Sequence, residues 1–227
     1  MKELIISIII ILTITHIPAQ QPPEREATTE EIKMLEDQLR LEPESSEIMM
    51  KLGIIYHGLA RKGDKKAVKK AEDIFKKLLQ LEPKNAEALG WYGSVLTMRG
   101  RDEWLPLLKI KYVNDGLKKM DKSVELDSNN ITVRMVRANT CLALPENIFH
   151  RTEVAVQDFE HLLSLREAQP DVFDEDLLAS IYLGLGNAYK KKGDILKARA
   201  NWQKVVDVAP NSEQMQEAKK LLADTEG

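Results

Sequence analysis

Side chains that could carry out catalysis or bind a metal are few along this chain and lie far apart. His57, His150 and His161 stand in separate stretches, so they do not form the pair at helical spacing that holds zinc. Asp158 and His161 are one helical turn apart and could pair, but no nucleophile stands near them. We therefore expect each histidine to be a lone surface or turn residue.

Cys141 is the single cysteine of the chain, which excludes an internal disulfide and any cysteine-based zinc site. It falls where a helix packs against its neighbour, so an inert buried thiol is expected in preference to a nucleophile. The sequence has no glycine-rich phosphate loop and no Gly-x-Ser-x-Gly turn. We predict no catalytic residue, no metal and no cofactor, and we do not expect an enzyme.

Composition excludes two further classes of protein. The 227 residues are 43% hydrophobic and 30% charged, which is too apolar for a disordered chain. The formal net charge of −3 lacks the basic surplus that a general nucleic-acid binder needs. We expect a helix-rich globular protein with no nucleic-acid partner.

Apolar residues recur at intervals of three and four beyond residue 30, which predicts helices throughout. The stretch AEDIFKKLLQLEPKN (71–85) recurs in altered form at 116–130, 155–165 and 198–211, with a shorter echo at 30–43. Each full copy follows another predicted helix, in which a small residue stands three positions before a larger one. These pairs are Gly53 with Tyr56, Gly93 with Leu96, Ala138 with Cys141, and Gly186 with Tyr189. The small residue lets two helices approach closely, and we expect the larger one to fill the space beside the crossing point.

The last copy resembles a complete tetratricopeptide repeat. The residues at the spacing of that repeat are Tyr182, Leu185, Gly186, Tyr189, Gly193, Ala198, Trp202, Val205 and Pro210. The resemblance covers residues 30–227 and implies an all-α, right-handed superhelical solenoid of helix-turn-helix repeats. We expect about four repeats, roughly 46–85, 86–130, 131–173 and 179–212, with a half-repeat before them and a capping helix at 213–225. The first three repeats depart from the family pattern, and we expect extra residues between their paired helices.

Residues 1–19 differ from the rest of the chain. Lys2 precedes an apolar run from Leu4 to Ile14, and Ala19 offers a small residue at a cleavage site. The run is shorter than the roughly 20 residues that span a bilayer. This layout predicts a signal peptide, with an uncleaved N-terminal anchor as the alternative, followed by a flexible tether over 20–29. We expect the repeat domain, 30–227, to be exported, either periplasmic or secreted, or anchored by its N-terminal segment.

The resemblance implies a binding groove lined by the first helix of each pair. The family's register places these residues in it: Met50, Ile54, Trp91, Met98, Met135, Asn139, Leu142, Leu183 and Asn187. Asn139 and Asn187 directly follow the small signature residue, where peptide-binding members use an asparagine to bind the ligand backbone. The resemblance thus implies a scaffold or adaptor that holds a peptide or helix of another protein. Packing against neighbouring helices or a second copy of the chain is the alternative for these side chains. A carrier of a lipid or small molecule for an envelope transport system is the second functional hypothesis.

A lysine-rich edge is expected where the paired helices are joined. It comprises Lys65, Lys66, Lys69, Lys70, Lys190, Lys191 and Lys192. The first four stand at the start of a second helix, where the helix dipole favours acidic residues, so the dipole does not explain them. We expect this edge to face an acidic partner or an anionic membrane surface, with a solvated charged face as the alternative. Trp104, Tyr112 and Phe149 lie in the turns at the same edge, where they would either pack together or form an exposed patch.

Overall fold

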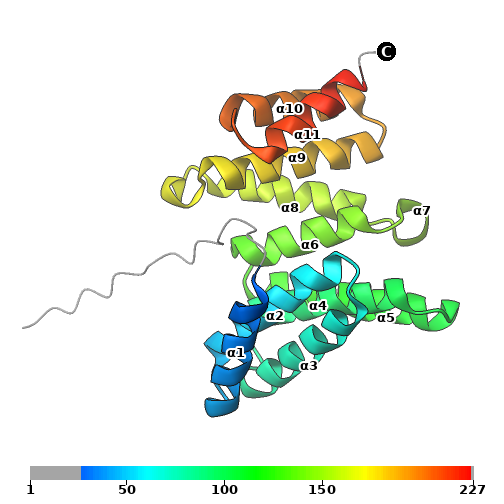
Figure 1. Ribbon diagram of the computed structural model, residues 1–227. Helices are drawn as coiled ribbons and strands as arrows, with labels where there is room; N and C mark the ends of the chain where they lie inside the picture. The colour runs from blue at the N-terminus through cyan, green and yellow to red at the C-terminus, as the bar shows by residue number, and fades with distance from the viewer. Residues whose placement is uncertain (1–26, 226–227) are drawn as a thin grey trace, which may run out of the picture.

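The computed structural model describes residues 27–225, which fold into helices joined by short turns (Figure 1). The signal or anchor expected at 1–19 and most of the tether expected at 20–29 lie outside the described residues. No strand occurs between residues 27 and 225. The helices are α1 (Thr29–Leu41), α2 (Ser46–Arg61), α3 (Lys65–Leu81), α4 (Ala86–Asp102), α5 (Pro106–Leu126), α6 (Ile131–Ala143), α7 (Glu146–Phe149), α8 (Thr152–Leu165), α9 (Glu175–Lys191), α10 (Ile195–Val208) and α11 (Glu213–Ala223).

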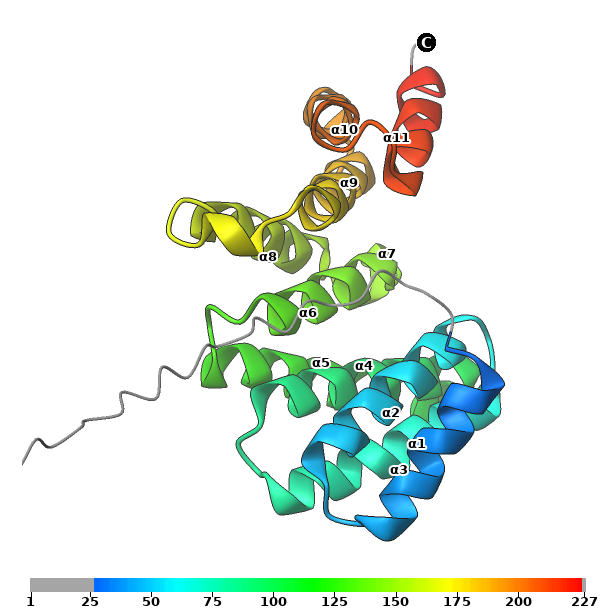
Figure 2. The same ribbon diagram turned by 60° about the vertical axis from the view of Figure 1, so that its left-hand side comes forward.

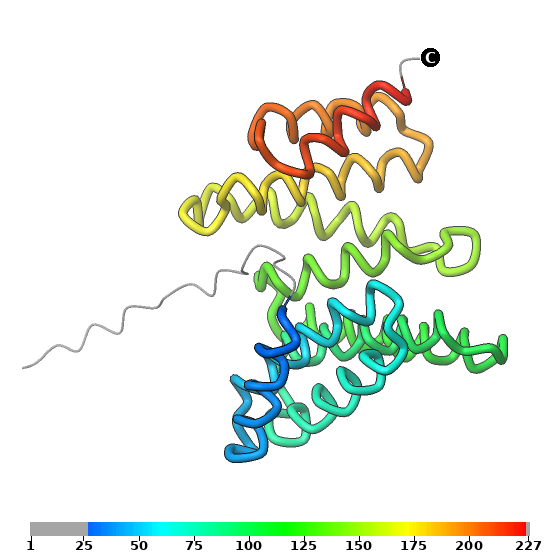
Figure 3. Tube along the Cα trace, in the orientation of Figure 1, coloured from blue at the N-terminus to red at the C-terminus, as the bar shows by residue number. Residues whose placement is uncertain are grey.

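Eight of these helices form four hairpins that stack in chain order. The pairs are α2 with α3, α4 with α5, α6 with α8, and α9 with α10 (Figures 2 and 3). The first helices also contact one another along the stack, α2 with α4, α4 with α6, and α6 with α9. Helix α1 packs on α2 as a half-repeat, and α11 packs on α9 and α10 as a cap. The prediction of an all-α solenoid of about four repeats with a half-repeat and a cap is confirmed.

Local sequence signals explain where the helices begin. Side-chain oxygens accept a hydrogen bond from a backbone N–H of the first turn in most of them, as expected for N-caps. The capping residues are Thr28, Ser45, Asp64, Asn85, Asn130, Asp174, Asp194 and Ser212. Gly63 and Gly193 precede two of these caps with φ of 101° and 82°, a left-handed conformation that glycine adopts without a steric penalty. The Gly-Asp pair therefore builds the same turn in the first and last hairpins.

The turn lengths correct one expectation. Extra residues between the paired helices were expected in the first three repeats. Only residues 62–64 separate α2 from α3, as many as separate α9 from α10, so this prediction is wrong for the first repeat. Residues 103–105 alone separate α4 from α5, so the prediction is wrong for the second repeat too, whose added residues lengthen α5 to 21 residues. The third repeat does carry an insertion, which includes α7.

Aromatic rings of the second helices pack against the signature glycines of the first helices. A Cβ atom on Gly53 would lie 2.6 Å from the ring of Phe75, and one on Gly186 would lie 2.5 Å from the indole of Trp202. Both rings are fully buried. The large residue three positions after the glycine was expected to fill this space, but the ring facing the glycine comes from the other helix of the hairpin.

Helices α4 and α5 approach still more closely, through their backbones. A Cβ atom on Gly93 would lie 2.6 Å from the carbonyl oxygen of Gly116, and one on Gly116 would lie 2.4 Å from the carbonyl oxygen of Gly93. A Cβ atom on Gly100 would likewise lie 2.8 Å from the carbonyl oxygen of Lys109. Glycine at these positions allows a hairpin in which little side-chain volume separates the two axes.

The buried apolar residues form two clusters that follow each other along the chain. The N-terminal core runs from Leu35 to Val95 and joins α1 to α4, whereas the C-terminal core runs from Val113 to Ala218 and joins α5 to α11. Trp91 is a partly buried residue of α4 that packs against both. Trp91 thus connects the two halves of the solenoid.

Candidate interaction surfaces

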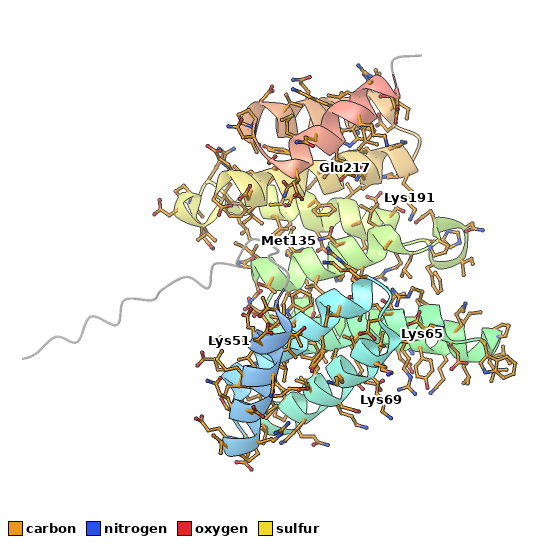
Figure 4. The ribbon with its side chains drawn as sticks, viewed as in Figure 1. Lys51, Lys65, Lys69, Met135, Lys191 and Glu217 are labelled. Atoms are coloured by element: carbon orange, nitrogen blue, oxygen red, sulfur yellow. The ribbon has the colours of Figure 1, made fainter. Side chains whose placement is uncertain are left out.

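The first-helix face is the surface formed by α2, α4, α6 and α9, the helices that contact one another along the stack. All nine residues expected in the groove belong to these helices, but their accessibility differs. Ile54 and Asn139 are exposed. Met135 is buried in the C-terminal core and is labelled in Figure 4. The remaining residues are half-buried: Met50, Trp91, Met98, Leu142, Leu183 and Asn187.

The two asparagines expected to bind a ligand backbone differ in what they contact. The Oδ1 atom of Asn187 accepts a hydrogen bond of 3.1 Å from the indole Nε1 of the buried Trp202. A buried N–H left without such a partner would destabilise the fold, so Asn187 has a role inside its own hairpin. Asn139 is exposed and is the better placed of the two to meet a ligand.

A chain of polar side chains crosses three first helices beneath this face. Nε2 of His57 in α2 lies 2.9 Å from Oγ of Ser94 in α4, and Ser94 Oγ lies 3.0 Å from Oγ1 of Thr140 in α6. The ring of Trp91 packs edge-on against His57 at 4.7 Å between centroids. Burial lowers the pKa of His57 to about 4, with a smaller contribution from the nearby Arg61. The expectation of a surface or turn histidine at position 57 is wrong.

Asp158 and His161 do not pair. Asp158 is fully buried and accepts hydrogen bonds from Nη1 of Arg134 at 2.7 Å and from Nε of Arg137 at 2.8 Å. His161 Nε2 instead lies 3.0 Å from Oδ1 of Asn129. The carboxylate of Asp158 therefore joins α8 to α6 by ion pairs, which a buried carboxylate needs to offset its desolvation.

Cys141 is buried, and burial raises the pKa of its thiol, as expected for an unreactive cysteine. Among residues 27–225, no three histidine, cysteine, aspartate or glutamate side chains are grouped as a metal site would require.

Four lysines of the expected basic edge form contacts within the chain. Lys70 donates hydrogen bonds of 2.9 Å to Glu36 and to the hydroxyl of Tyr56, which fastens α1 to the first hairpin. Nζ of Lys191 donates to the carbonyl oxygens of Leu142 and Leu144 at the end of α6. Lys192 pairs with Glu153, and Lys190 lies over the ring of Trp202.

Lys65, Lys66 and Lys69 are exposed at the start of α3. Figure 4 places Lys65, Lys69 and Lys191 on one side of the molecule, away from Lys51. The side chains of Lys65 and Lys69 line an open cleft of about 550 Å³ together with Trp104. This cleft is lined mainly by charged residues of α3 and α4, and it is open to solvent.

The three aromatic residues expected at this edge do not form one cluster. Tyr112 is half-buried beneath the guanidinium of Arg99, 4.3 Å from the ring centroid, and Phe149 packs against the C-terminal core. Trp104 is 82% exposed.

The neighbours of Trp104 were missed by the sequence reasoning. The tip patch comprises the large apolar residues exposed around the turn between α4 and α5: Trp104, Leu105, Leu107, Leu108 and Ile110. The signal that could have revealed them is the segment WLPLLKI, in which apolar residues stand too densely for one face of a helix.

None of the helices in the described part of the chain combines the length and the apolar character that a membrane crossing demands.

Comparison with solved structures shows that the chain has the fold of tetratricopeptide repeat (TPR) proteins. A thermophilic TPR protein of Thermus thermophilus superposes with a TM-score of 0.68 at 14% identity, over 85% of this chain and 89% of that one. YrrB, described as a TPR protein with an unusual peptide-binding site, gives a TM-score of 0.50 at 20% identity, over 84% of this chain and 82% of that one. No protein-family model and no curated protein matches the sequence.

Proposed function

We propose that this TPR-fold protein is a non-catalytic scaffold that holds a peptide or helix of another protein on its first-helix face. The fold supports a role in protein interaction, and YrrB is a structural neighbour described as having a peptide-binding site. The observation that carries the proposal is the first-helix face itself. Four first helices lie in series and present Ile54 and Asn139 to solvent among half-buried apolar side chains.

The chemistry of the face favours an extended or helical segment with apolar side chains. Met50 and Met98 offer flexible thioether side chains that adapt to different apolar partners. Asn139 offers both a donor and an acceptor, which is the pair that a peptide backbone requires. The proposal includes a location outside the cytosol, supported by the composition of residues 1–19. N-terminal sequencing of the mature protein, together with fractionation, would test that location, and an intact chain in the cytosol would contradict it.

Affinity capture with site-specific photo-crosslinking tests the scaffold role. The full chain would carry a photo-crosslinking residue at Asn139 in one sample and at Gln203, exposed on α10, in the other. We expect a protein crosslinked from Asn139 and not from Gln203. The double variant Ile54→Ser, Asn139→Ala should lose this protein.

A matched control variant separates loss of contact from loss of fold. Leu126→Ser, Gln203→Ala removes a side chain as exposed as Ile54, 38% against 37%, from the second helices. It should retain the partner. Equal capture by both variants would contradict binding at this face. Trp91 and Asn187 are unsuited to this test, because Trp91 packs against both cores and Asn187 bonds to Trp202.

The carrier hypothesis stays a prediction. Two open clefts lie among α3, α4 and α5, and both have charged residues in their lining.

A further inference from the structure

We propose that the tip patch is a membrane-contacting site that inserts into the interface of an anionic phospholipid surface. The patch is distinct from the first-helix face, so it adds a second contact to the scaffold. It lies at the outer end of the α4–α5 hairpin, and α5 reaches further than the neighbouring helices at this edge (Figures 1 and 3).

The exposure of the patch indicates that its side chains serve a contact outside this chain. Trp104 is 82% and Leu107 is 83% exposed, and Leu105, Leu108 and Ile110 are each more than one-third exposed. The packing of α5 on α4 begins around Lys109, where Gly100 approaches the backbone. Five large apolar side chains within seven residues are exposed at this one turn, and a concentration of exposed apolar side chains marks an interaction site.

Trp and Leu at a protruding tip suit a lipid interface. A tryptophan has a large apolar ring with one N–H donor, and it concentrates at the boundary between lipid headgroups and acyl chains. The interface accepts a convex apolar tip to a depth of roughly 5–10 Å without requiring a complementary pocket. A docking protein would have to supply such a pocket.

The charges around the tip favour an anionic surface. Lys65, Lys66 and Lys69 of α3 are exposed, and Lys65 and Lys69 line the same cleft as Trp104. Lys109 and Lys111 are exposed within the first turns of α5, and Nζ of Lys111 lies 3.8 Å from a carboxylate oxygen of Asp115. Their long stems can lie along the acyl boundary while each ammonium reaches the headgroups.

Most acidic residues beside the tip have partners of their own. Glu72 forms an ion pair with Arg99 at 2.6 Å, and Asp102 forms one with Arg101 at 2.7 Å. Glu103 accepts hydrogen bonds from the backbone N–H groups of Trp104 and Leu105. Asp73 is the remaining acidic residue of the cleft lining. The ion pairs are neutral overall, which leaves the charges of Asp73 and Glu103 against four exposed lysines: Lys65, Lys66, Lys69 and Lys109. The tip therefore carries a net positive charge, which an anionic leaflet attracts.

Vesicle binding by the full chain tests the proposal. The probes are phosphatidylcholine vesicles with and without phosphatidylglycerol, with co-sedimentation and tryptophan fluorescence as readouts. We expect binding to the anionic vesicles and a blue shift of the emission as Trp104 leaves water. Trp104→Ser, Leu107→Ser should weaken binding about tenfold or more and remove the shift, because both apolar side chains would have been inserted. Both residues are more than four-fifths exposed, so the fold should tolerate the change.

Matched variants elsewhere in the chain serve as controls. Met34→Ser, Leu41→Ser removes exposed apolar side chains from α1 and should bind as the native chain does. Lys65, Lys69 and Lys109 changed to glutamine should abolish the preference for anionic lipid. The same change at Lys33, Lys51 and Lys219, exposed residues of α1, α2 and α11, should preserve that preference.

Three outcomes would overturn the proposal. They are no binding of the native chain to anionic vesicles, equal binding by the tip variant, and loss of a protein partner by the tip variant without any binding to vesicles. Ile54→Ser, Asn139→Ala should still bind vesicles, so failure of the scaffold role and failure of the membrane role are distinguishable.

Discussion

His57 illustrates how single residues in this solenoid are used for connection between repeats. Its ring is 8% exposed between α2 and α4 and shares a hydrogen bond with Ser94, which in turn bonds to Thr140 of α6. Asp158, by contrast, joins the two helices of a single hairpin, because its ion pairs link α8 to α6. Buried polar groups are costly without partners, so each of these contacts fixes the position of one helix on the next.

The burial of His57 predicts a loss of stability in acid. The pKa of His57 is about 4 in the folded protein and about 6.5 in the unfolded chain. Because the folded pKa is the lower one, the unfolded chain binds the proton first as the pH falls. The free energy of unfolding is unaffected by the titration of this histidine above about pH 6.5. It falls by about 3 kcal/mol between about pH 6.5 and pH 4, because the proton binds to the unfolded chain first. Urea denaturation at several pH values would measure this loss.

Variants isolate the histidine from the carboxylates that titrate in the same range. His57→Gln should flatten the pH dependence of the free energy of unfolding between about pH 6.5 and 4. His150→Asn replaces an exposed histidine in left-handed conformation, which asparagine also adopts, and should keep the native slope. An unchanged slope in His57→Gln would show that the ring titrates in the folded state as it does in water.

At the scale of elements, glycine sets how closely the helices of a hairpin approach. In the α4–α5 hairpin the backbones themselves are in contact at Gly93 and Gly116, whereas in α2–α3 and α9–α10 a buried ring lies against the glycine. A ring can shift by a few tenths of an ångström, but a backbone carbonyl within a helix cannot move independently of its turn.

Two glycine substitutions in helices should have opposite effects on stability. Gly93→Ala would place a Cβ atom 2.6 Å from the carbonyl oxygen of Gly116 and 2.7 Å from Cγ of Met120. It should destabilise the fold by about 3 kcal/mol, because the hairpin must open. Gly58→Ala meets no atom within 4 Å and should stabilise α2 by about 0.5–1 kcal/mol, since glycine is a poor helix former. Urea denaturation of both variants is the measurement. Equal effects of the two would mean that the α4–α5 contact is looser than described.

The helices and their pairing could be predicted from sequence because their signals are local. Apolar spacing, N-capping residues and the Gly-Asp turns all act within a few residues. The contacts of individual side chains could not be predicted in the same way, since they depend on elements distant in sequence. Tyr189 marks the repeat, but Trp202 is the residue that packs on Gly186. His57 is buried because α4 of the next hairpin covers it, and Trp104 is exposed because no element does.

At the scale of the whole molecule, the solenoid consists of two cores in series. Among residues 27–225 the main contacts between repeats join neighbours in the stack, so cooperativity depends on these interfaces. The interface between the N-terminal and C-terminal cores includes Trp91, which packs against both. Loss of this side chain removes apolar contacts from two clusters at once.

Trp91→Ala should separate the unfolding of the two halves. Replacing a large packed tryptophan by alanine lowers the free energy of unfolding by about 3–5 kcal/mol. Because Trp91 packs against both cores, this loss weakens the interaction between them. We expect one urea transition in the native chain and two in the variant, with hydrogen exchange assigning each transition to its half. Trp104→Ala, at an exposed tryptophan, should keep the single transition. A single transition in Trp91→Ala would show that the remaining contacts of α4 with α5 and α6 couple the halves.

The order of the two cores along the chain also bears on how the protein is made. Each core consists of residues contiguous in sequence, and the N-terminal core is complete once α4 has been synthesised, at Asp102. The first half can therefore form the contacts within its own core while the second is still being synthesised on the ribosome. The contacts of Trp91 with the C-terminal core would form only after the residues of that core have been synthesised. Chain growth from the N-terminus therefore supplies every buried residue of the N-terminal core before any of the C-terminal core exists.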